Sequence, residues 1–241
     1  MNPNNLNTNN TFTQKLEAEI EKKHLLKHPF YQLWEKGTLP MTVMQKYAEQ
    51  YYHLERNFPI FLSLMHSGCD VFEVRQAITD NLYDEEHGDK NHTELWLRFG
   101  ESIGAKRSNM QNSTPLPETK QAIEMFKRMS TSSFLEGAGA LAAYESQIPK
   151  IAEKKLHGLK HNYGIDDPRG IEFFQLHGIL DIKHANVWWD IIEQHINTPE
   201  RQLAVMKAVQ NGRDSLWGFL DGVCREYMPE DKKVEMQKMM C

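Results

Sequence analysis

Three polar side chains interrupt the apolar face of a predicted helix at residues 171–192, IEFFQLHGILDIKHANVWWDII. Because a helix advances about 100° per residue, His177, Asp181 and His184 continue the stripe of aromatic and aliphatic residues that faces the core. A buried carboxylate or imidazole without a partner is costly, so three on one stripe require a common partner. A carboxylate followed three positions later by a histidine is a known arrangement of metal ligands on a helix. The segment therefore predicts a metal-binding helix.

A second polar cluster, DEEHGDKNH at residues 84–92, lies between apolar runs that have helical spacing. If one helix continues through it, Glu85 and His92 lie above one another on the inner face, and most of the other charged side chains face solvent. An Asp89-x-x-His92 pair is an alternative on the same spacing. Either pairing adds a carboxylate and an imidazole to the core.

A third segment, residues 134–156, has Glu145 as the lone acid in its inner stripe. A single such residue is most often a hydrogen-bonded core group, and the polar stripe at residues 177–184 is what favours metal binding over that interpretation. Carboxylates and imidazoles suit iron or manganese, and the set is large enough for two ions with positions left for oxygen. The candidate ligands are Glu85, His92, Glu145, His177, Asp181 and His184.

The elements that must position these residues are predicted to be helices. Apolar residues recur at helical spacing over residues 12–28, 41–66, 70–101, 118–135, 135–161, 168–195 and 199–227. No alternating strand pattern is present. The sequence predicts one all-α domain, residues 12–228, of about seven or eight helices. A polar leader, residues 1–11, is expected to be disordered. A charged tail, residues 229–241, is either a short helix or disordered.

Local sequence features predict several helix boundaries. Asp70, Asp167 and Thr198 are expected to cap helix N-termini, and Pro168 and Pro199 to occupy first-turn positions. Pro149, inside a helical run, is expected to kink it. Two further features have alternative interpretations. GAGALA, residues 137–142, matches a dinucleotide fingerprint but lacks a preceding strand, so close helix packing is favoured. His24 and His28 could bind a haem iron, although capping a helix is the commoner role.

Composition limits the classes of partner. The chain has 241 residues and a net charge of −5, which disfavours nucleic acid and acidic membranes as partners. Its three cysteines, Cys69, Cys224 and Cys241, form no close pair, which fits a reducing cytoplasm. No window approaches the roughly 18 apolar residues that a membrane span requires. The composition therefore predicts a cytoplasmic protein without a nucleic-acid or membrane partner.

Several motifs resemble the family of the Chlamydia protein associating with death domains. They are KHLLKHPFYQLWEKGTLP, YAEQYYH, DNLYDEEHGDKNHTELW, AAYESQIPKIAEKKLHGL and HGILDIKHA, in order over roughly residues 20–222. The resemblance implies a haem-oxygenase-like helical fold and a dinuclear metal site with the six ligands above, and it favours Glu85 over Asp89. The pyrroloquinoline-quinone synthase C and thiaminase II families are similar more distantly.

The resemblance also implies an activity. Members of the family are implicated in making p-aminobenzoate for folate by oxygen-dependent cleavage of one of their own tyrosines, with a lysine as amino donor. By motif, Tyr31 in HPFY is the sacrificed residue, Tyr47 in YAEQYY is a second redox-active tyrosine, and Lys155 in AEKK is the donor. Periodicity places Lys155 at the rim of the inner face, and only the motif selects it over Lys154. Further tyrosines expected near the site are Tyr51, Tyr52 and Tyr144.

Two other activities remain open at this point. A multi-turnover diiron oxygenase with a small external substrate would keep the six ligands but make Tyr31 dispensable. A cofactorless oxidase similar to pyrroloquinoline-quinone synthase C would need no metal, and the carboxylates disfavour it. Thiaminase chemistry needs a cysteine near the pocket, and none occurs between Cys69 and Cys224. The resemblance implies two ions per chain, Fe/Fe or Fe/Mn, with O2 and a reductant as co-substrates, and a homodimer. Death-receptor binding is not carried over, because the C-terminal region departs from the family.

Overall fold

The structure is a computed structural model that describes residues 11–239, apart from the side chains of Ile179 and Ile182. Within these residues every regular element is a helix, which confirms the all-α prediction. The helices are α1 (Phe12–Lys22), the 3₁₀ helix η1 (Leu25–Lys27), α2 (Pro29–Glu35), α3 (Met41–Glu55), α4 (Phe58–Ser67), α5 (Phe72–Glu86), α6 (His92–Ser102), α7 (Arg107–Asn112), α8 (Pro117–Ser132), α9 (Phe134–Glu145), α10 (Ile148–Asn162), α11 (Pro168–His195), α12 (Pro199–Tyr227) and α13 (Glu230–Met239). Almost all of the predicted leader lies outside the described residues.

The predicted number of helices is too low for the described residues. Three long segments each contain two helices, and the short helices α2 and α7 lie between the predicted segments. The chain breaks between α3 and α4, between α5 and α6, and between α9 and α10. Pro59 and Pro149 lie in the first turns of α4 and α10, where a missing amide hydrogen is tolerated. Pro149 therefore begins a helix and does not kink one. Gly88, with φ of 78°, and the Asn91 side chain, which caps α6, form the third break.

The predicted helix caps are confirmed at two of three positions. The side chains of Asp167 and Thr198 accept hydrogen bonds from the first turns of α11 and α12. The prediction for Asp70 is wrong, since α5 begins one residue later, after Val71, without a side-chain cap. His24 and His28 accept backbone hydrogen bonds through Nδ1 at the starts of η1 and α2. These two histidines are helix caps, as the commoner interpretation held.

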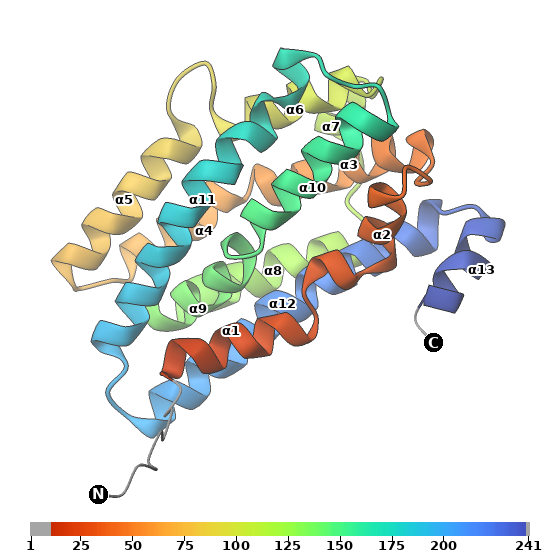
Figure 1. Ribbon diagram of the computed structural model, residues 1–241. Helices are drawn as coiled ribbons and strands as arrows, with labels where there is room; N and C mark the ends of the chain where they lie inside the picture. Colours follow the sequence, from red (N-terminus) through yellow and green to blue (C-terminus); the bar gives the residue numbers. More distant parts are fainter. Residues whose placement is uncertain (1–10, 240–241) are drawn as a thin grey trace, which may run out of the picture.

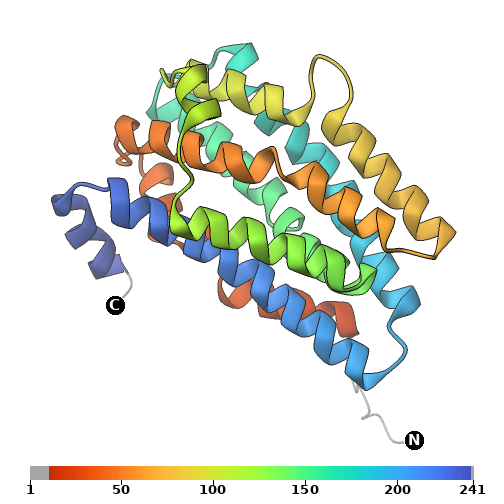
Figure 2. The ribbon, with the colours of Figure 1, turned by 180° about the vertical axis from the view of Figure 1, so that it is seen from behind.

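Helix α9 lies at the centre of the bundle, in contact with α8, α11 and α12 (Figure 1). It can be approached closely because it is rich in glycine and alanine. A Cβ atom added to Gly212 of α12 would lie 2.8 Å from the Ala140 carbonyl oxygen. The view from behind shows α8 and α12 side by side, with α3 and α4 running above them (Figure 2). The GAGALA segment therefore serves close helix packing.

The C-terminal tail forms α13 as far as Met239, so the short-helix alternative is confirmed for the described part of the tail. Met236 is its buried residue, and α13 packs against α2 (Figure 1). No helix within residues 11–239 combines the length and apolar character that a bilayer crossing needs. The long helix α11 contacts α5, α6, α9 and α10, and it is the element around which the candidate site is arranged.

Candidate metal centre

The six predicted ligands lie together in the interior of the bundle, with one residue that was not predicted, Glu55. The seven side chains come from five helices and are each between 1 and 6% exposed. Six of them form two groups of three, and within each group one ligand atom from every side chain lies within 4.8 Å of the others. The seventh, Asp181, lines the cavity at the cluster. The first group is Glu55, His92 and His177, and the second is Glu85, Glu145 and His184.

Two of the histidines are held by partners that leave one ring nitrogen facing the cluster. His177 donates from Nδ1 to the Phe173 carbonyl oxygen over 2.8 Å, so its Nε2 carries the lone pair. His184 donates from Nε2 to Asp84 Oδ2 over 3.1 Å, and its Nδ1 lies 3.6 Å from Glu145 Oε1. Metal-binding histidines in proteins are oriented by such partners on the opposite nitrogen.

Glu85 and His92 meet as predicted, but not on one continuous helix. Glu85 lies in the last turn of α5, and His92 is the first residue of α6 after the Asn91 cap. His92 Nδ1 is 2.7 Å from Glu85 Oε2, although the direction of approach does not satisfy a hydrogen bond. The loop between the two helices places Asp89 outside the cluster, since Asp89 is exposed. The structure therefore places Glu85, and not Asp89, beside His92 in the cluster.

Several buried polar atoms of the cluster have no hydrogen-bond partner among the described residues. They are both ring nitrogens of His92, Asp181 Oδ2, His184 Nδ1, and Asn81 Oδ1 beside them. Buried polar atoms are normally satisfied, so their concentration in one place indicates that an additional group belongs there. Carboxylate oxygens and imidazole nitrogens are donors suited to iron and manganese. The cluster fits a metal centre by this criterion.

The pKa shifts of the carboxylates in the cluster also support a metal centre. Burial, reinforced by Glu85, raises the pKa of Glu55 to about 8. Burial likewise raises the pKa of Glu145 to about 8, against hydrogen bonds from Trp188 and Asn81 that lower it. The pKa of Asp181 is raised well above its usual value by burial and by the neighbouring carboxylates. Carboxylates crowded in this way need positive charge nearby to ionise at neutral pH.

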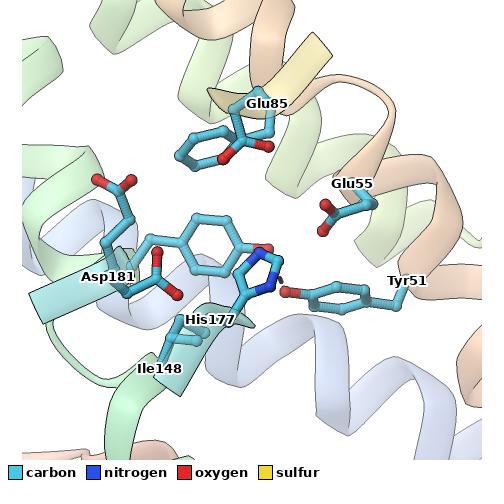
Figure 3. Close-up of a pocket in the computed structure, with 9 residues that line it drawn as sticks. Tyr51, Glu55, Glu85, Ile148, His177 and Asp181 are labelled. Atoms are coloured by element: carbon cyan, nitrogen blue, oxygen red, sulfur yellow. Dashed lines mark hydrogen bonds between the residues drawn. The ribbon is translucent and has the colours of Figure 1, made fainter. Parts of the chain in front are cut away.

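The cavity at the cluster is small. It offers about 20 Å³ to the centre of a water-sized sphere, which is room for about one small molecule. The carboxylates of Glu55, Glu85 and Asp181 and the ring of His177 converge on it (Figure 3). Tyr51 and Tyr144 also line it, as expected, whereas Tyr52 does not. This space is of the order of a molecule as small as water or O2.

Beside the cluster, Lys155 is enclosed by aromatic rings. Its Nζ lies 4.9–5.6 Å from the ring centroids of Tyr31, Trp34, Tyr47, Tyr51, Trp96 and Phe174. The prediction that Lys155 lies at the rim is wrong: it is 4% exposed, because helices from four other parts of the chain close over it. Burial lowers the pKa of Lys155 to about 7, against the opposing effect of Glu55. Lys154 is exposed and pairs with Glu35.

Tyrosine side chains lie between this lysine and the cluster of candidate ligands. Lys155 Nζ donates to the Tyr47 hydroxyl over 2.7 Å, and the hydroxyls of Tyr31 and Tyr47 are 3.4 Å apart. The Tyr47 and Tyr51 ring centroids are 5.6 Å apart, and the Tyr144 hydroxyl donates to that of Tyr51 over 2.5 Å. The structure therefore brings the predicted tyrosines and lysine into one buried region that reaches the cavity.

Glu55 is the residue of the cluster that the sequence analysis missed. It follows Tyr47 and Tyr51 at intervals of four residues, so it lies on the same helix face as these two tyrosines. This four-residue spacing could have identified Glu55 as an inward-facing residue from the sequence. However, α3 also buries Glu49, Gln50 and His53, so an inward-facing acid is not distinctive on this helix.

The fold and cluster define a class of protein. The structure superposes on a domain with a haem-oxygenase-like fold from Shewanella denitrificans with a TM-score of 0.76, at 21% identity, covering 89% of this chain and 91% of the other. Residues 45–217 match the profile of a family described as iron-containing redox enzymes. The chain belongs to this family, and the predicted haem-oxygenase-like fold is confirmed.

Similar sequences within the class have a named activity. The protein named 4-aminobenzoate synthase from Nitrosomonas europaea is 40% identical over 228 residues, covering 90% of this chain and 93% of that protein. The protein of the same name from Chlamydia muridarum is 37% identical, covering 87% of this chain and 89% of its own. These relatives confirm the resemblance that the motifs predicted.

Proposed function

We propose that this protein forms 4-aminobenzoate with bound metal, O2 and a reductant, using one of its own tyrosines as the carbon source. The observation that carries the proposal is the enclosure of two tyrosines and a lysine beside a metal-type cluster whose cavity has room for about one small molecule. The names of the relatives from Nitrosomonas europaea and Chlamydia muridarum support the product.

The metal part of the proposal is a pair of ions, Fe/Fe or Fe/Mn, bound in each chain. Glu85, His92, Glu145, His177, Asp181 and His184 would hold them. Iron supplies the activation of oxygen and the oxidising equivalents when it is bound. The chain itself orients the histidines through Phe173 and Asp84, and it keeps bulk water away by burying every ligand.

The organic part of the proposal follows from the product's carbon skeleton. The ring and Cβ of a tyrosine contain every carbon of 4-aminobenzoate. Tyr31 would lose its side chain by cleavage of the Cα–Cβ bond, with Cβ oxidised to the carboxylate at the expense of O2. The ring hydroxyl would leave as water and be replaced by nitrogen from Lys155, whose Nζ is 5.4 Å from the Tyr31 ring centroid. The lysine Cε–Nζ bond would then be oxidised at the expense of O2 and hydrolysed, which leaves Cε as an aldehyde. Tyr47 is as near to the lysine, at 4.9 Å, and the family motif selects Tyr31.

The environment of Lys155 favours the neutral amine that such a transfer needs. Burial lowers its pKa to about 7, so a large fraction is unprotonated at neutral pH. The one hydrogen bond that it donates, to Tyr47, holds Nζ among the tyrosine rings. Tyr47 is then a positioning residue for the amine and a redox-active neighbour of Tyr31, as the motif implies.

We extend the proposal to the state of the protein in the cell. Residues 12–228 form one catalytic domain, and the protein is a cytoplasmic homodimer that acts on small molecules and has no nucleic-acid or membrane partner. The net charge of −5 and two buried free cysteines, Cys69 and Cys224, support this assignment.

The test uses purified protein loaded with iron, or with iron and manganese, supplied with O2 and a reductant but no organic substrate. Wild type is expected to release 4-aminobenzoate. The Tyr31→Phe variant is expected to release none while it keeps its metal, and Tyr83→Phe, at an exposed tyrosine, serves as the matched control. Normal product from Tyr31→Phe would refute the assignment of Tyr31. Product that appears only when an organic substrate is added would refute self-consumption.

A further inference from the structure

Glu55 occupies an unusual position at the end of α3. It is 4% exposed, and its carboxylate points into the cavity (Figure 3). Within the described part of the chain its carboxylate forms no side-chain hydrogen bond and no ion pair. Glu49, two turns earlier on the same helix and 6% exposed, is paired with Lys46 over 2.8 Å. A buried carboxylate without a partner is strongly unfavourable, so Glu55 requires an explanation that Glu49 does not.

Glu55 lies close to two histidines that can act as metal ligands. One of its oxygens lies within 4.8 Å of ring nitrogens of both His92 and His177, which are themselves within that distance of each other. Two ligand atoms on one ion, each about 2.1 Å from it, are at most about 4.2 Å apart. The three side chains would therefore need to close by only about half an ångström to share an ion.

We propose that Glu55 is a seventh ligand of the centre and binds the ion that His92 and His177 hold. The inference rests on the proposed metal-dependent function, and it adds a residue that the family motifs do not assign. It gives the two ions different surroundings. One has two imidazoles and the Glu55 carboxylate, and the other has one imidazole with Glu85 and Glu145.

The charge of the centre supports a fourth carboxylate. Glu55, Glu85, Glu145 and Asp181 together carry four negative charges when ionised, which equals the charge of two divalent cations. With three carboxylates, the buried centre would keep an excess positive charge beside the buried amine of Lys155. Because isolated buried charge is costly, the neutral arrangement is favoured.

The experiment compares metal-free wild type with Glu55→Gln, which keeps the shape but removes the charge, and with Glu49→Gln as the matched control. Each protein is titrated anaerobically with Mn(II), and bound ions are counted by elemental analysis while free Mn(II) is followed by its paramagnetic resonance. Wild type and Glu49→Gln are expected to bind two ions. Glu55→Gln is expected to bind one of the two at least tenfold more weakly, since even partners of metal ligands contribute about 10–100-fold.

Thermal unfolding gives an independent readout. Metal-free Glu55→Gln is expected to unfold at a temperature no lower than metal-free wild type, because the substitution removes a buried, unpaired carboxylate. Added Mn(II) should then raise the unfolding temperature less than in wild type, because ligand stabilisation follows affinity. A group with a merely structural role would show the reverse pattern, a less stable metal-free protein with an unchanged response to metal.

The outcomes separate the inference from the proposed function. Two ions bound by Glu55→Gln with wild-type affinity would overturn the role of Glu55 and leave the six-ligand centre standing. A wild type that binds no metal would overturn the proposed function and the inference together. If Glu55→Gln does not fold, Glu55→Asp decides by the same titration, since it keeps the charge but shortens the reach. Unchanged affinity in that variant would count against a direct bond.

Discussion

The cluster of candidate metal ligands and the aromatic enclosure of Lys155 are adjacent and both buried, but they differ in polarity and in how far their polar atoms are hydrogen-bonded. The cluster gathers carboxylates and imidazoles, and several of its donor atoms lack partners among the described residues. The enclosure contains a single amine, which donates a hydrogen bond to Tyr47 and has six aromatic rings around it. The cluster is therefore incomplete without added positive charge, whereas the enclosure is satisfied by the chain alone.

This difference indicates how the two regions divide the chemistry. In the proposed function the cluster binds ions and O2, so removing a ligand should affect metal content and product together. The enclosure is built to hold an amine and tyrosine rings in contact without water, so changes there should affect product and leave metal content unchanged. Substitutions in the two regions should therefore give separable phenotypes, and the predictions below run from the largest effect to the smallest.

The largest effect is expected from Glu145→Ala, because Glu145 is buried at the cluster and receives hydrogen bonds from Trp188 and Asn81. We expect a clear fall from two ions per chain and no detectable 4-aminobenzoate. Elemental analysis and product chromatography measure the two quantities. The exposed Glu153→Ala variant is the control. Wild-type metal content in Glu145→Ala would remove Glu145 from the centre.

Lys155→Met should abolish product while the protein keeps both ions, because among the described residues the lysine donates to Tyr47 and forms no hydrogen bond or ion pair with the ligand set. Lys154→Met is a close control, since its side chain is exposed and pairs with Glu35. The measurement is 4-aminobenzoate per chain together with metal per chain. Loss of metal in Lys155→Met would show that the two regions are not separable.

Asp84→Asn should weaken metal binding without abolishing it, because Asp84 only orients His184 from the opposite ring nitrogen. Partners of this kind contribute about 10–100-fold to metal affinity. Titration of the metal-free variant with Mn(II) measures the change. Affinity equal to that of wild type would mean that His184 does not depend on this contact.

The smallest effect is a pH dependence that belongs to the enclosure. The pKa of Lys155 is lowered by burial to about 7, and the neutral amine is the form that can donate nitrogen. Below this pKa the neutral fraction rises about tenfold per pH unit, and above it the fraction is nearly constant. The rate of product formation in metal-loaded protein should therefore rise between pH 6 and 8 and then level off. A rate that falls over this range would contradict the role of the neutral amine.

Much of this architecture could be predicted from the sequence, because the buried faces of the long helices carry apolar residues at helical spacing. The His177, Asp181 and His184 stripe was visible because all three share one helix with a strongly apolar inner face. The three helix breaks were not visible, since Pro59, Pro149 and the Asn91 cap leave the apolar spacing on either side intact.

The enclosure was harder to predict than the cluster for a physical reason. Lys155 is buried by residues of α2, α3, α6 and α11, and a contact among five helices leaves no periodic pattern in any one of them. Glu55 was missed because α3 buries several other polar residues. Tyrosine roles came from the family motif, as a buried tyrosine on a helix is an ordinary core residue.

The most direct test of the account is an isotope experiment on the protein itself. The chain is produced with ¹³C-labelled tyrosine and ¹⁵N-labelled lysine, loaded with metal in unlabelled buffer, and supplied with O2 and a reductant. The account predicts 4-aminobenzoate that carries both labels, in an amount that stops at about one molecule per chain. Unlabelled product, or product that accumulates well beyond the number of chains, would contradict it.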